Sequence, residues 1–332
     1  MNSNHLPNPN IGHLFEGILE SLNQKMSDAL CDLKKISEGM PTLYEAANHA
    51  ITGGKRMRPL ICLLACDGIE GDSSKILPTA VGIEMIHAFT LVHDDIIDGD
   101  ELRRGKPSIK HLWGDDLAIL TGDVLFALAY KNILSNLKTD GIDRGRMTRV
   151  LELSSEACLK LAQGQVMDIS VPIDNSWKDD VIKLKTAPLF SLASTSGAIL
   201  GNGSEEDVKC MEKFGLYLGM AFQIKDDVLN ISGNADRVGK PWGGDLKKGK
   251  FTLPVAHALS GVEKEDVEKI FSSPERESVL MRMIKNRGSI EYSEKIARRL
   301  IESAKQNLRA IKRKDERSAL EFIADHAVKR GE

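Results

Sequence analysis

Hydrophobic residues recur every three or four positions along most of the chain, which is the period of an amphipathic α-helix. The clearest examples are residues 80–98, AVGIEMIHAFTLVHDDIID, and residues 211–231, MEKFGLYLGMAFQIKDDVLNI. Alternating patterns of the kind that predict β-strands between turn residues are absent from the sequence. The pattern therefore predicts an all-α fold.

Glycine, proline and polar residues gather in short segments between the predicted helices. These segments are ITGGKRMRP near residue 51, GDSSKILP near 71, GDELRRGKPS after 98, KTDGID near 138, VPIDNS near 171 and GNGSEED near 201. A longer irregular stretch, GNADRVGKPWGGDLKKGK, runs from Gly233 to Lys250, and loops of this length are typically functional or disordered. Because no linker, repeat or low-complexity tract interrupts the pattern, we expect one large helical domain over residues 1–332.

Composition narrows the class of protein. The chain has 332 residues, of which 42% are hydrophobic, with a net charge of -3 and a pI near 6.3. This balance argues against nucleic-acid binding, which needs a basic excess or stripe. The polar start, MNSNHLPNPN, differs from a signal peptide, and no apolar run approaches the roughly 18 residues of a membrane span. We therefore expect a soluble, cytoplasmic protein without a transmembrane segment.

The five cysteines form an odd set, and two of them, Cys62 and Cys66, lie four residues apart in the apolar run LICLLAC. One face of a helix would bury both side chains. This spacing favours thiols in a hydrophobic core over a disulfide or a zinc site.

Adjacent aspartates occur at residues 94–95, 115–116, 179–180 and 226–227. The pairs at 115–116 and 179–180 begin helical runs, where acidic residues interact favourably with the helix dipole and cap free N–H groups. Four residues after the first aspartate these pairs have Ile119 and Lys183, which are not metal ligands. Structural roles explain both pairs.

Asp94 and Asp95 instead close an apolar helix, at the end where the dipole disfavours negative charge. With Asp98 they form DDxxD, which places Asp94 and Asp98 on one face, a turn apart. Such close carboxylates repel each other unless a cation lies among them, and their hard oxygen donors suit Mg²⁺, which also binds substrate phosphates. The alternative is a solvated helix end, but the surrounding IHAFTLVHDDIID is too apolar for an open surface.

Asp226 and Asp227 also lie inside an apolar helix. Gln223, Asp226 and Asn230 share one helix face, and a buried row of polar groups is costly without partners. Two acidic rows in one helical domain suggest two facing walls of one pocket with metal between them.

The loops of the chain supply matching positive charge. GGKRMRP places Lys55, Arg56 and Arg58 between two glycines and a proline, and DELRRGKPS places Arg103 and Arg104 just after the first acidic row. Further basic residues near predicted helix breaks are Lys185, Lys240 and Lys250. Arginine makes bidentate contacts to phosphate, whereas lysine acts as a point charge. A single basic cluster is commonly just solvated surface, but together with two acidic rows these clusters fit two diphosphates.

Seven motifs, in this order, resemble the trans-isoprenyl diphosphate synthases of the polyprenyl synthetase family, most of all the short-chain geranylgeranyl and farnesyl diphosphate synthases. They are GGKRMRP, LVHDDIIDGDELRRGKPS, TGDVLFA, GQVMD, KTAPLF, FQIKDDVLN and VGKPWGGDLKKGKFTLP. The resemblance covers about residues 40 to 330. It implies an all-α fold with a central cavity, a homodimer, and the head-to-tail condensation of isopentenyl diphosphate with an allylic diphosphate such as dimethylallyl, geranyl or farnesyl diphosphate.

The resemblance also implies roles for individual residues. Mg²⁺, about three ions per active site, would be bound by Asp94, Asp98 and the neighbouring Asp95, and from the opposite wall by Asp226. The residues implied to contact the allylic diphosphate are Arg103, Lys185, Lys240 and Lys250, with Thr186 and Gln223 near its first carbons. Those implied to hold isopentenyl diphosphate are Lys55, Arg58, His87 and Arg104, aided by the backbone of Gly54. Without the motifs, His87 would be interpreted as an ordinary core histidine.

The resemblance further implies that the product grows along the helix that precedes DDxxD. Phe89, the fifth residue before Asp94, and its neighbour Thr90 are therefore the predicted determinants of chain length. A bulky ring at Phe89 predicts geranylgeranyl diphosphate as the main product, with farnesyl diphosphate as the alternative. Ordinary core packing of Phe89 is the other interpretation.

Two other classes of function stay open at this point. A terpene cyclase would share the fold and an acidic row but would not bind isopentenyl diphosphate, for which GGKRMRP and the RRG after the first row argue. A non-catalytic subunit of a heteromeric synthase would be expected to lose acidic motifs, whereas this chain keeps the first one. The second motif departs from the family's DDxxD pattern at Asn230, whose neutral oxygen we expect to substitute for the missing carboxylate with little loss of activity.

Overall fold

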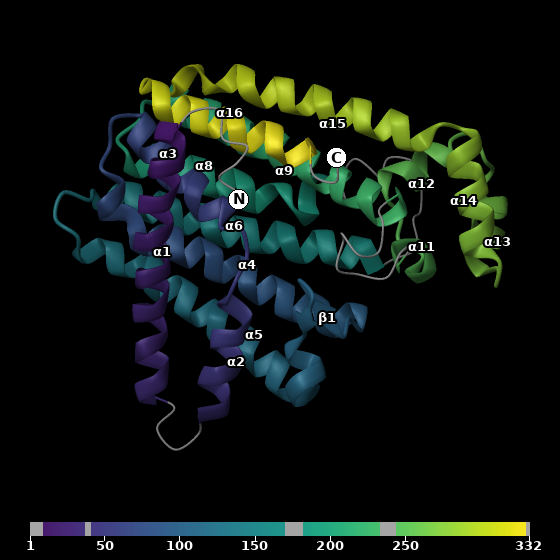
Figure 1. Cartoon of the computed structure of the whole chain (residues 1–332), viewed down its shortest axis with the longest axis horizontal. Helices are drawn as coiled ribbons and strands as arrows, with labels where there is room; N and C mark the ends of the chain where they lie inside the picture. The colour runs from purple at the N-terminus through teal and green to yellow at the C-terminus, as the bar shows by residue number, and fades with distance from the viewer. Residues whose placement is uncertain (1–8, 37–40, 170–181, 233–243, 330–332) are drawn as a thin grey trace. The chain divides into compact units, whose positions relative to one another are not determined.

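The computed structural model describes residues 9–36, 41–169, 182–232 and 244–329 (Figure 1). These residues fall into two compact units, one made of 1–155, 192–212 and 308–323, the other of 156–191, 213–307 and 324–332. Four helices, α6 (Arg144–Ile169), α8 (Ala187–Leu200), α9 (Glu205–Ser232) and α16 (Lys314–Lys329), contribute residues to both units. The expectation of a single domain over the whole chain, and of a central cavity in it, stays a prediction.

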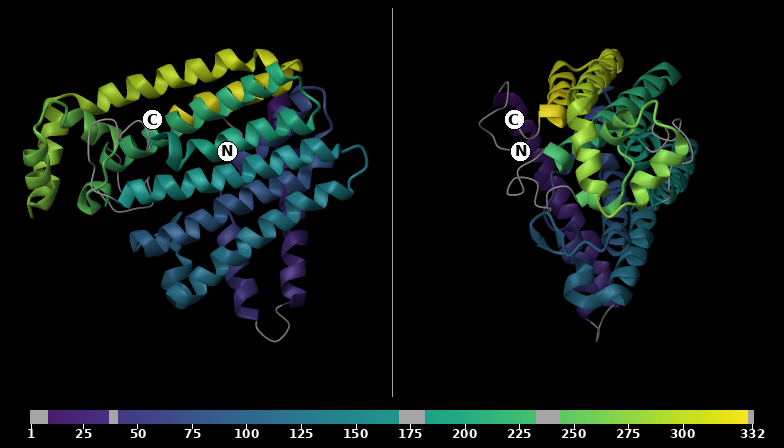
Figure 2. Two further views of the ribbon diagram at one scale, coloured as in Figure 1. Left: turned by 180° about the vertical axis from the view of Figure 1, so that it is seen from behind. Right: turned by 90° about the vertical axis from the view of Figure 1, so that its right-hand side faces the viewer.

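The first unit contains the N-terminal helices. They are α1 (Pro9–Ile36), α2 (Pro41–Ile51), α3 (Met57–Gly68), α4 (Leu77–Asp98) and α5 (Ile109–Ser135), with the short 3₁₀ helices η2 (Ser73–Ile76), η3 (Asn136–Lys138) and η4 (Asn307–Ala310), the last of which begins in the second unit. Most residues of α3 are buried, and α4 and α5 pack side by side, as Figures 1 and 2 show from different directions. The apolar run that predicted a helix over 80–98 thus forms a core helix whose last turn ends in the aspartates.

A short β-hairpin follows α4. Its strands, β1 (Leu102–Arg103) and β2 (Lys106–Pro107), are antiparallel. The two residues between them, Arg104 and Gly105, have φ of 55° and 74°, which is the conformation of a tight two-residue hairpin turn. The sequence predicted only a helix break here, because two-residue strands are too short to show alternation. The all-α prediction is otherwise confirmed.

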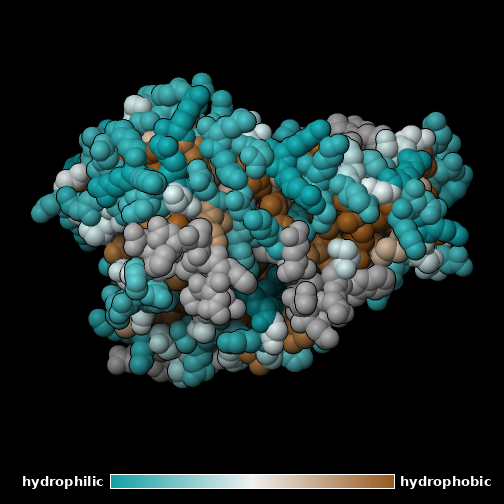
Figure 3. Space-filling view, turned by 45° about the horizontal axis from the view of Figure 1, so that its top comes forward, coloured by the Kyte–Doolittle hydropathy of each residue, from teal (hydrophilic) through white to brown (hydrophobic). Residues whose placement is uncertain are grey.

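The second unit contains α11 (Gly244–Lys248), α12 (Leu253–Ala258), α13 (Lys264–Ser272), α14 (Arg276–Asn286) and α15 (Ser289–Gln306). A hydrophobic cluster lies among α9, α11, α12 and α14, and it consists of Ile231, Leu246, Val255, Ala258, Leu259, Leu280 and Ile284. On α15 the buried residues recur with helical spacing, and they are Ser289, Ser293, Ala297, Ile301 and Ala304. Hydrophilic side chains dominate the face of the molecule in Figure 3, with hydrophobic residues in smaller patches between them.

All five cysteines are free thiols. Cys62 and Cys66 are completely buried on α3, as the apolar run around them predicted. Burial raises the pKa of the Cys66 thiol to about 12, and it also raises the pKa of Cys62. Both side chains are therefore neutral, and they act as small apolar groups in the core.

Two of the described helices, Ser73–Asp98 and Ile109–Lys138, are long and apolar enough to span a membrane by length and composition alone. The most apolar windows of these helices are 61% and 44% buried, and core helices of soluble proteins pass the same test. The expected absence of a transmembrane segment stays a prediction.

Candidate active site

The first acidic row lies in the last turn of α4. The backbone amides of Gly99 and Asp100 bond to the carbonyls of Ile96 and Asp95, at 3.3 and 2.9 Å, and these bonds close the helix after Asp98. This paired arrangement is a common way to satisfy the last carbonyls of a helix. The helix end is thus fixed in place together with the carboxylates that it bears.

Asp95 is paired with Arg103 of the hairpin. Arg103 Nε donates to Asp95 Oδ1 at 2.8 Å, and Nη2 contacts the same oxygen and lies 3.6 Å from Asp100 Oδ2. Burial alone would lower the pKa of Arg103, but its bond to Asp95 and the nearby aspartates raise that pKa above its ordinary value. Asp95 is 4% exposed, whereas Asp94 and Asp98 are half-buried. The structure therefore ties Asp95 to the protein's own arginine, and its predicted role as a metal ligand stays a prediction.

Asp94 and Asp98 are suited to a hard cation. They offer carboxylate oxygens one turn apart on the same helix. Among the residues that the structure describes, no three His, Cys, Asp or Glu side chains form a cluster able to hold a metal ion. Mg²⁺ commonly binds through one or two carboxylates and takes its other ligands from water and substrate phosphates. The donor set of Asp94 and Asp98 fits such an ion.

Arg56 and Arg58 of the predicted anion-binding loop are both buried. Arg56 precedes α3 with a left-handed φ of 51°, and its Nη1 donates to Glu84 at 2.9 Å while its Nη2 donates to the carbonyl of Ile51. Glu84 is 3% exposed, so this ion pair lies inside the unit. Lys55, in contrast, is exposed. Arg56 thus fixes the loop to α4 and leaves Lys55 and Arg58 as its phosphate-binding candidates.

Gly54 and Arg104 lie against each other. A Cβ atom on Gly54 would be 2.5 Å from Arg104 Nη1, so the guanidinium group occupies the space that a side chain would take. The φ of Gly54 is also +90°, which side chains rarely adopt. The hairpin turn therefore places the Arg104 guanidinium group against the GGKRMRP loop. Two motifs that were predicted to hold the same diphosphate are thus in contact.

His87 lies half-buried on α4, near four arginines. Burial lowers the pKa of its imidazole well below the ordinary value, and the nearby positive charges lower it further; they belong to Arg58, Arg104, Arg103 and Arg56. His87 is therefore neutral at pH 7. A bound anion would relieve the repulsion among these cations, and the neutral imidazole can donate one hydrogen bond to it.

The aromatic ring of Phe89 packs against α5. Its centroid lies 5.1 Å from that of Phe126 in an edge-to-face arrangement, and Phe126 contacts Tyr130 in turn, at 5.0 Å. Thr90 Oγ1 donates to the carbonyl of His87 at 2.8 Å, so its hydroxyl is occupied by its own helix. The ring of Phe89 is thus held in place, and Phe126 is a neighbour that sequence reasoning did not identify.

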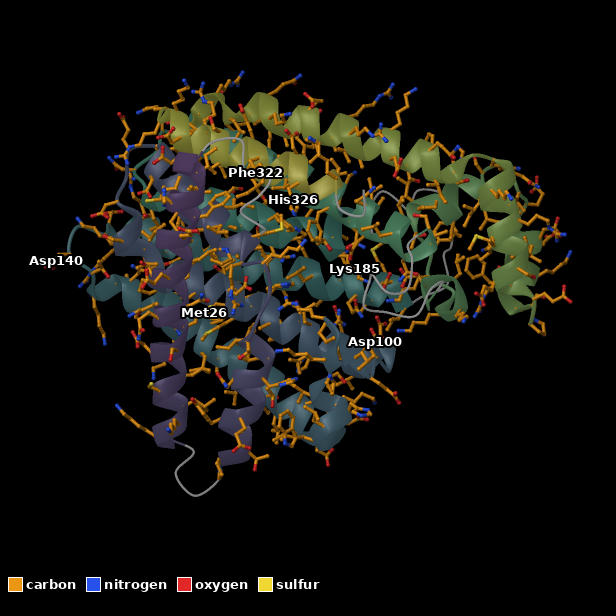
Figure 4. All side chains as sticks on the ribbon, viewed as in Figure 1. Met26, Asp100, Asp140, Lys185, Phe322 and His326 are labelled. Atoms are coloured by element: carbon orange, nitrogen blue, oxygen red, sulfur yellow. The ribbon has the colours of Figure 1, made fainter. Side chains whose placement is uncertain are left out.

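Three charged groups meet in the second unit. Lys185, labelled in Figure 4, donates to Asp168 Oδ2, and Lys250 Nζ lies 3.2 Å from the same oxygen. Burial alone would raise the pKa of Asp168, but the two ammonium groups outweigh it and lower the pKa below its ordinary value. The structure thus joins two lysines that were predicted to contact one diphosphate. Their shared partner, Asp168, ends the GQVMD motif but was not predicted as a site residue.

A chain of hydrogen bonds connects Thr186 to the second acidic row. Thr186 Oγ1 donates to Gln223 Oε1, and Gln223 Nε2 donates to Asp227 Oδ1 at 2.7 Å. Asp227 is 6% exposed, and burial together with the neighbouring Asp245 carboxylate raises its pKa well above the ordinary value. Asp226, in contrast, is exposed. Of the two adjacent aspartates, Asp226 is therefore the one accessible to a ligand.

Asn230 makes a contact that the sequence did not predict. Its Oδ1 accepts a hydrogen bond of 3.1 Å from the backbone amide of Asp245, in α11. This contact uses the neutral oxygen that was expected to substitute for a metal-binding carboxylate. Lys240, the remaining predicted contact to the allylic diphosphate, lies outside the described residues.

Comparison with known proteins shows which family this chain is similar to. A family model described as polyprenyl synthetase matches residues 40–286. A short chain isoprenyl diphosphate synthase of Methanothermobacter thermautotrophicus is 36% identical over 308 residues, which cover 90% of this chain and 93% of that protein.

Two solved structures are similar over nearly their full length. The geranylgeranyl pyrophosphate synthetase of Pyrococcus horikoshii Ot3 has a TM-score of 0.85 and 34% identity, covering 97% of this chain and 99% of that one. The polyprenyl synthase of Caulobacter crescentus CB15, complexed with calcium and isoprenyl diphosphate, has a TM-score of 0.83 and 29% identity and covers 98% of both chains.

Proposed function

The chain belongs to the polyprenyl synthetase family, and on this premise we propose that it is a trans-prenyltransferase. It condenses isopentenyl diphosphate head-to-tail with allylic diphosphates, and its main product is geranylgeranyl diphosphate. The similar proteins are named as isoprenyl or geranylgeranyl synthases, which supports a synthase over a terpene cyclase or a non-catalytic subunit.

The neutral His87 among four arginines is the observation that supports this function most directly. Two of these arginines are paired inside the protein, Arg56 with Glu84 and Arg103 with Asp95, while Arg58 and Arg104 add further positive charge beside the imidazole that a bound anion would balance. A diphosphate whose negative charge is neutralised without metal ions fits this cluster of arginines. Isopentenyl diphosphate is therefore held by Lys55, Arg58, His87 and Arg104, together with the backbone of Gly54.

The allylic diphosphate is held by the remaining charged groups. Arg103 and the lysine pair Lys185 and Lys250 contact its oxygens, and Lys240 is proposed to do the same. About three Mg²⁺ ions bind with it through Asp94, Asp98 and Asp226, with Asp95 close by. When bound, Mg²⁺ neutralises the developing charge of the leaving diphosphate.

The chain's own residues support ionisation of the allylic C–O bond. Lys185 and Lys250 balance the charge of the departing diphosphate. Gln223 is oriented by its bond to Asp227, so its Oε1 faces Thr186 and presents a lone pair that stabilises an adjacent carbocation. The double bond of isopentenyl diphosphate then attacks that cation, and the released diphosphate accepts the proton that is lost.

Product length is limited at Phe89. Its ring is fixed against Phe126, and it lies five residues before Asp94 on α4. A growing tail that runs along this helix meets the ring about a turn and a half beyond the aspartates. This position supports a short product, with geranylgeranyl diphosphate as the main one and farnesyl diphosphate as the alternative.

The enzyme is proposed to be a cytoplasmic homodimer. Support comes from α5, whose exposed large hydrophobic residues are Leu112, Ile119, Leu120, Phe126 and Leu134. Exposed apolar side chains gathered on one helix are typical of protein interfaces. Sedimentation of the purified protein measures the assembly directly, and a monomer at micromolar concentration would refute it.

One assay tests the proposed reaction. Purified protein is incubated with Mg²⁺, labelled isopentenyl diphosphate and, in turn, dimethylallyl, geranyl or farnesyl diphosphate, and the products are separated by chain length. We expect label in geranylgeranyl diphosphate from all three primers, and incorporation about 100- to 1000-fold slower with the Asp226→Ala variant. Accumulation of farnesyl diphosphate would favour the alternative product, and a wild-type protein that incorporates no label would refute the synthase.

A further inference from the structure

The five-residue helix α11 lies directly before Lys250 and is held at both ends by side chains outside the charged cluster. At its start, Asn230 of α9 accepts the amide of Asp245 at 3.1 Å. At its end, Arg276 of α14 donates from Nη2 to the carbonyl of Lys247. Between these contacts, Leu246 is completely buried in the hydrophobic cluster of the second unit.

Arg276 also connects α11 to α13. Its Nη1 donates to the carbonyl of Phe271 at 2.9 Å, so a single guanidinium group bridges two helix ends. A Cβ atom on Gly249 would lie 3.1 Å from Arg276 Nη1, which shows how closely the guanidinium group approaches the backbone there. Both carbonyls belong to the last turn of a helix, where the helix itself supplies no donor.

A hydrogen-bonded turn closes α11 at its C-terminal end. The amides of Gly249 and Lys250 bond to the carbonyls of Leu246 and Asp245, at 3.1 and 2.9 Å, and Gly249 has a left-handed φ of 74°. This turn fixes the direction in which the Lys250 side chain leaves the helix. The side chain is buried, and its ammonium group reaches Asp168.

We infer that Asn230 and Arg276 are positioning residues that hold α11 so that the Lys250 ammonium group lies at the Asp168–Lys185 pair. The inference rests on the proposed role of Lys250 in holding the allylic diphosphate. A long lysine side chain has many rotamers, and a ligand gains affinity when the charged group is already in place. Asn230 also connects α11, and with it Lys250, to α9, the helix that carries Asp226. The asparagine that replaces the last aspartate of DDxxD would therefore have a structural role.

The test is a double-mutant cycle on ligand affinity. The probe is an allylic thiolodiphosphate, in which sulfur replaces the ester oxygen of the leaving group, and its binding with Mg²⁺ is measured by calorimetry. We expect Arg276→Met to weaken binding about tenfold and Lys250→Met to weaken it at least as much. Because Arg276 acts through Lys250, adding Arg276→Met to Lys250→Met should cost less than twofold more.

The chain offers a matched control in Arg287. This arginine follows the C-terminal end of α14, and its Nη1 donates to the carbonyl of Ser260, which lies outside α11. Arg287→Met should leave the affinity for the thiolodiphosphate within twofold of wild type. The affinity for isopentenyl diphosphate should stay unchanged in both arginine variants. A general loss of structure would lower this affinity as well.

The outcomes separate this inference from the proposed function. If Lys250→Met weakens binding but Arg276→Met does not, or if the two losses are additive, the positioning role is wrong and the proposed function survives. If Lys250→Met itself has no effect, the positioning role and the proposed contact of Lys250 with the allylic diphosphate are both wrong, whereas the reaction itself is refuted only if wild type incorporates no labelled isopentenyl diphosphate. Should Arg276→Met fail to fold, Asn230→Ala replaces it in the cycle, and adding Asn230→Ala to Lys250→Met should likewise cost less than twofold more.

Discussion

Replacing Asp168 by asparagine removes a carboxylate that both Lys185 and Lys250 contact. The three side chains are 7%, 20% and 10% exposed, so water does little to screen the loss. Removing one partner from a buried ion pair costs about 3 to 5 kcal/mol, and the asparagine oxygen still accepts a hydrogen bond, so we expect the lower end of this range.

This cost converts to a shift in melting temperature. An unfolding entropy of about 2.1 cal/mol/K per residue over 332 residues amounts to about 0.7 kcal/mol/K. A loss of about 3 kcal/mol in the free energy of unfolding then lowers Tm by about 4 °C. Differential scanning calorimetry of wild type and Asp168→Asn at pH 7 measures the shift.

The pH dependence provides a second check. Because the pKa of Asp168 is lowered in the folded protein, its pairing stabilises the fold above its unfolded pKa of about 3.9 and is lost as pH falls through the folded value. The difference in Tm between wild type and Asp168→Asn should therefore be constant from about pH 5 to pH 8 and shrink only below about pH 4.

Glu205→Gln is the matched control, because Glu205 pairs with Arg149 at 2.6 Å while both side chains are exposed. Water and salt screen such a pair, so its removal should leave Tm close to the wild-type value. If Asp168→Asn has the same Tm as the Glu205→Gln control, the argument that burial strengthens the Asp168 ion pairs is wrong.

Three further predictions concern product length, metal binding and pH. Phe89→Ala should lengthen the main product by about one isoprene unit, because it removes the ring that Phe126 holds in place. An unchanged product distribution on chromatography would show that another residue limits product length. Asp226→Ala should lower kcat by about 100- to 1000-fold and Asn230→Ala by about tenfold in steady-state assays, since only Asp226 is proposed to bind metal; equal losses would contradict this assignment. Wild type should lose stability as pH falls below about 6.5, because the lowered pKa of His87 lets only the unfolded chain protonate this side chain there, and the His87→Gln variant should not show this loss. Identical Tm-versus-pH curves for the two proteins would count against the cationic surroundings of His87.

The sequence predicted those features that depend on local spacing. The helical period located the core helix that ends in Asp98, and the four-residue interval placed Asp94 and Asp98 on one face. The sequence of GGKRMRP did not show which side chain lies against its glycines. In this structure the guanidinium of Arg104 occupies the space that a side chain on Gly54 would take.

Features that depend on contacts between distant segments could not be predicted. Lys185 and Lys250 are separated in sequence by the whole of α8, α9 and α11, and only the folded second unit shows that both contact Asp168. The link between Asn230 and Asp245 likewise depends on where α11 packs, which no local pattern encodes. The motifs predicted groups that bind ligand, whereas the structure shows which side chains those groups contact.

The two aspartate pairs show why adjacency itself is informative. Successive residues on a helix point about 100° apart, so one carboxylate of a pair turns inward when the other is accessible. Asp95 turns inward and is paired with Arg103, whereas Asp227 turns inward beside the Asp245 carboxylate, and its raised pKa favours the neutral acid. With a neutral Asn230 as well, the second row offers less negative charge than the first. If a cation binds at the second row as proposed, it would depend more on the diphosphate for its remaining ligands, so substrate binding and metal binding at Asp226 would be coupled.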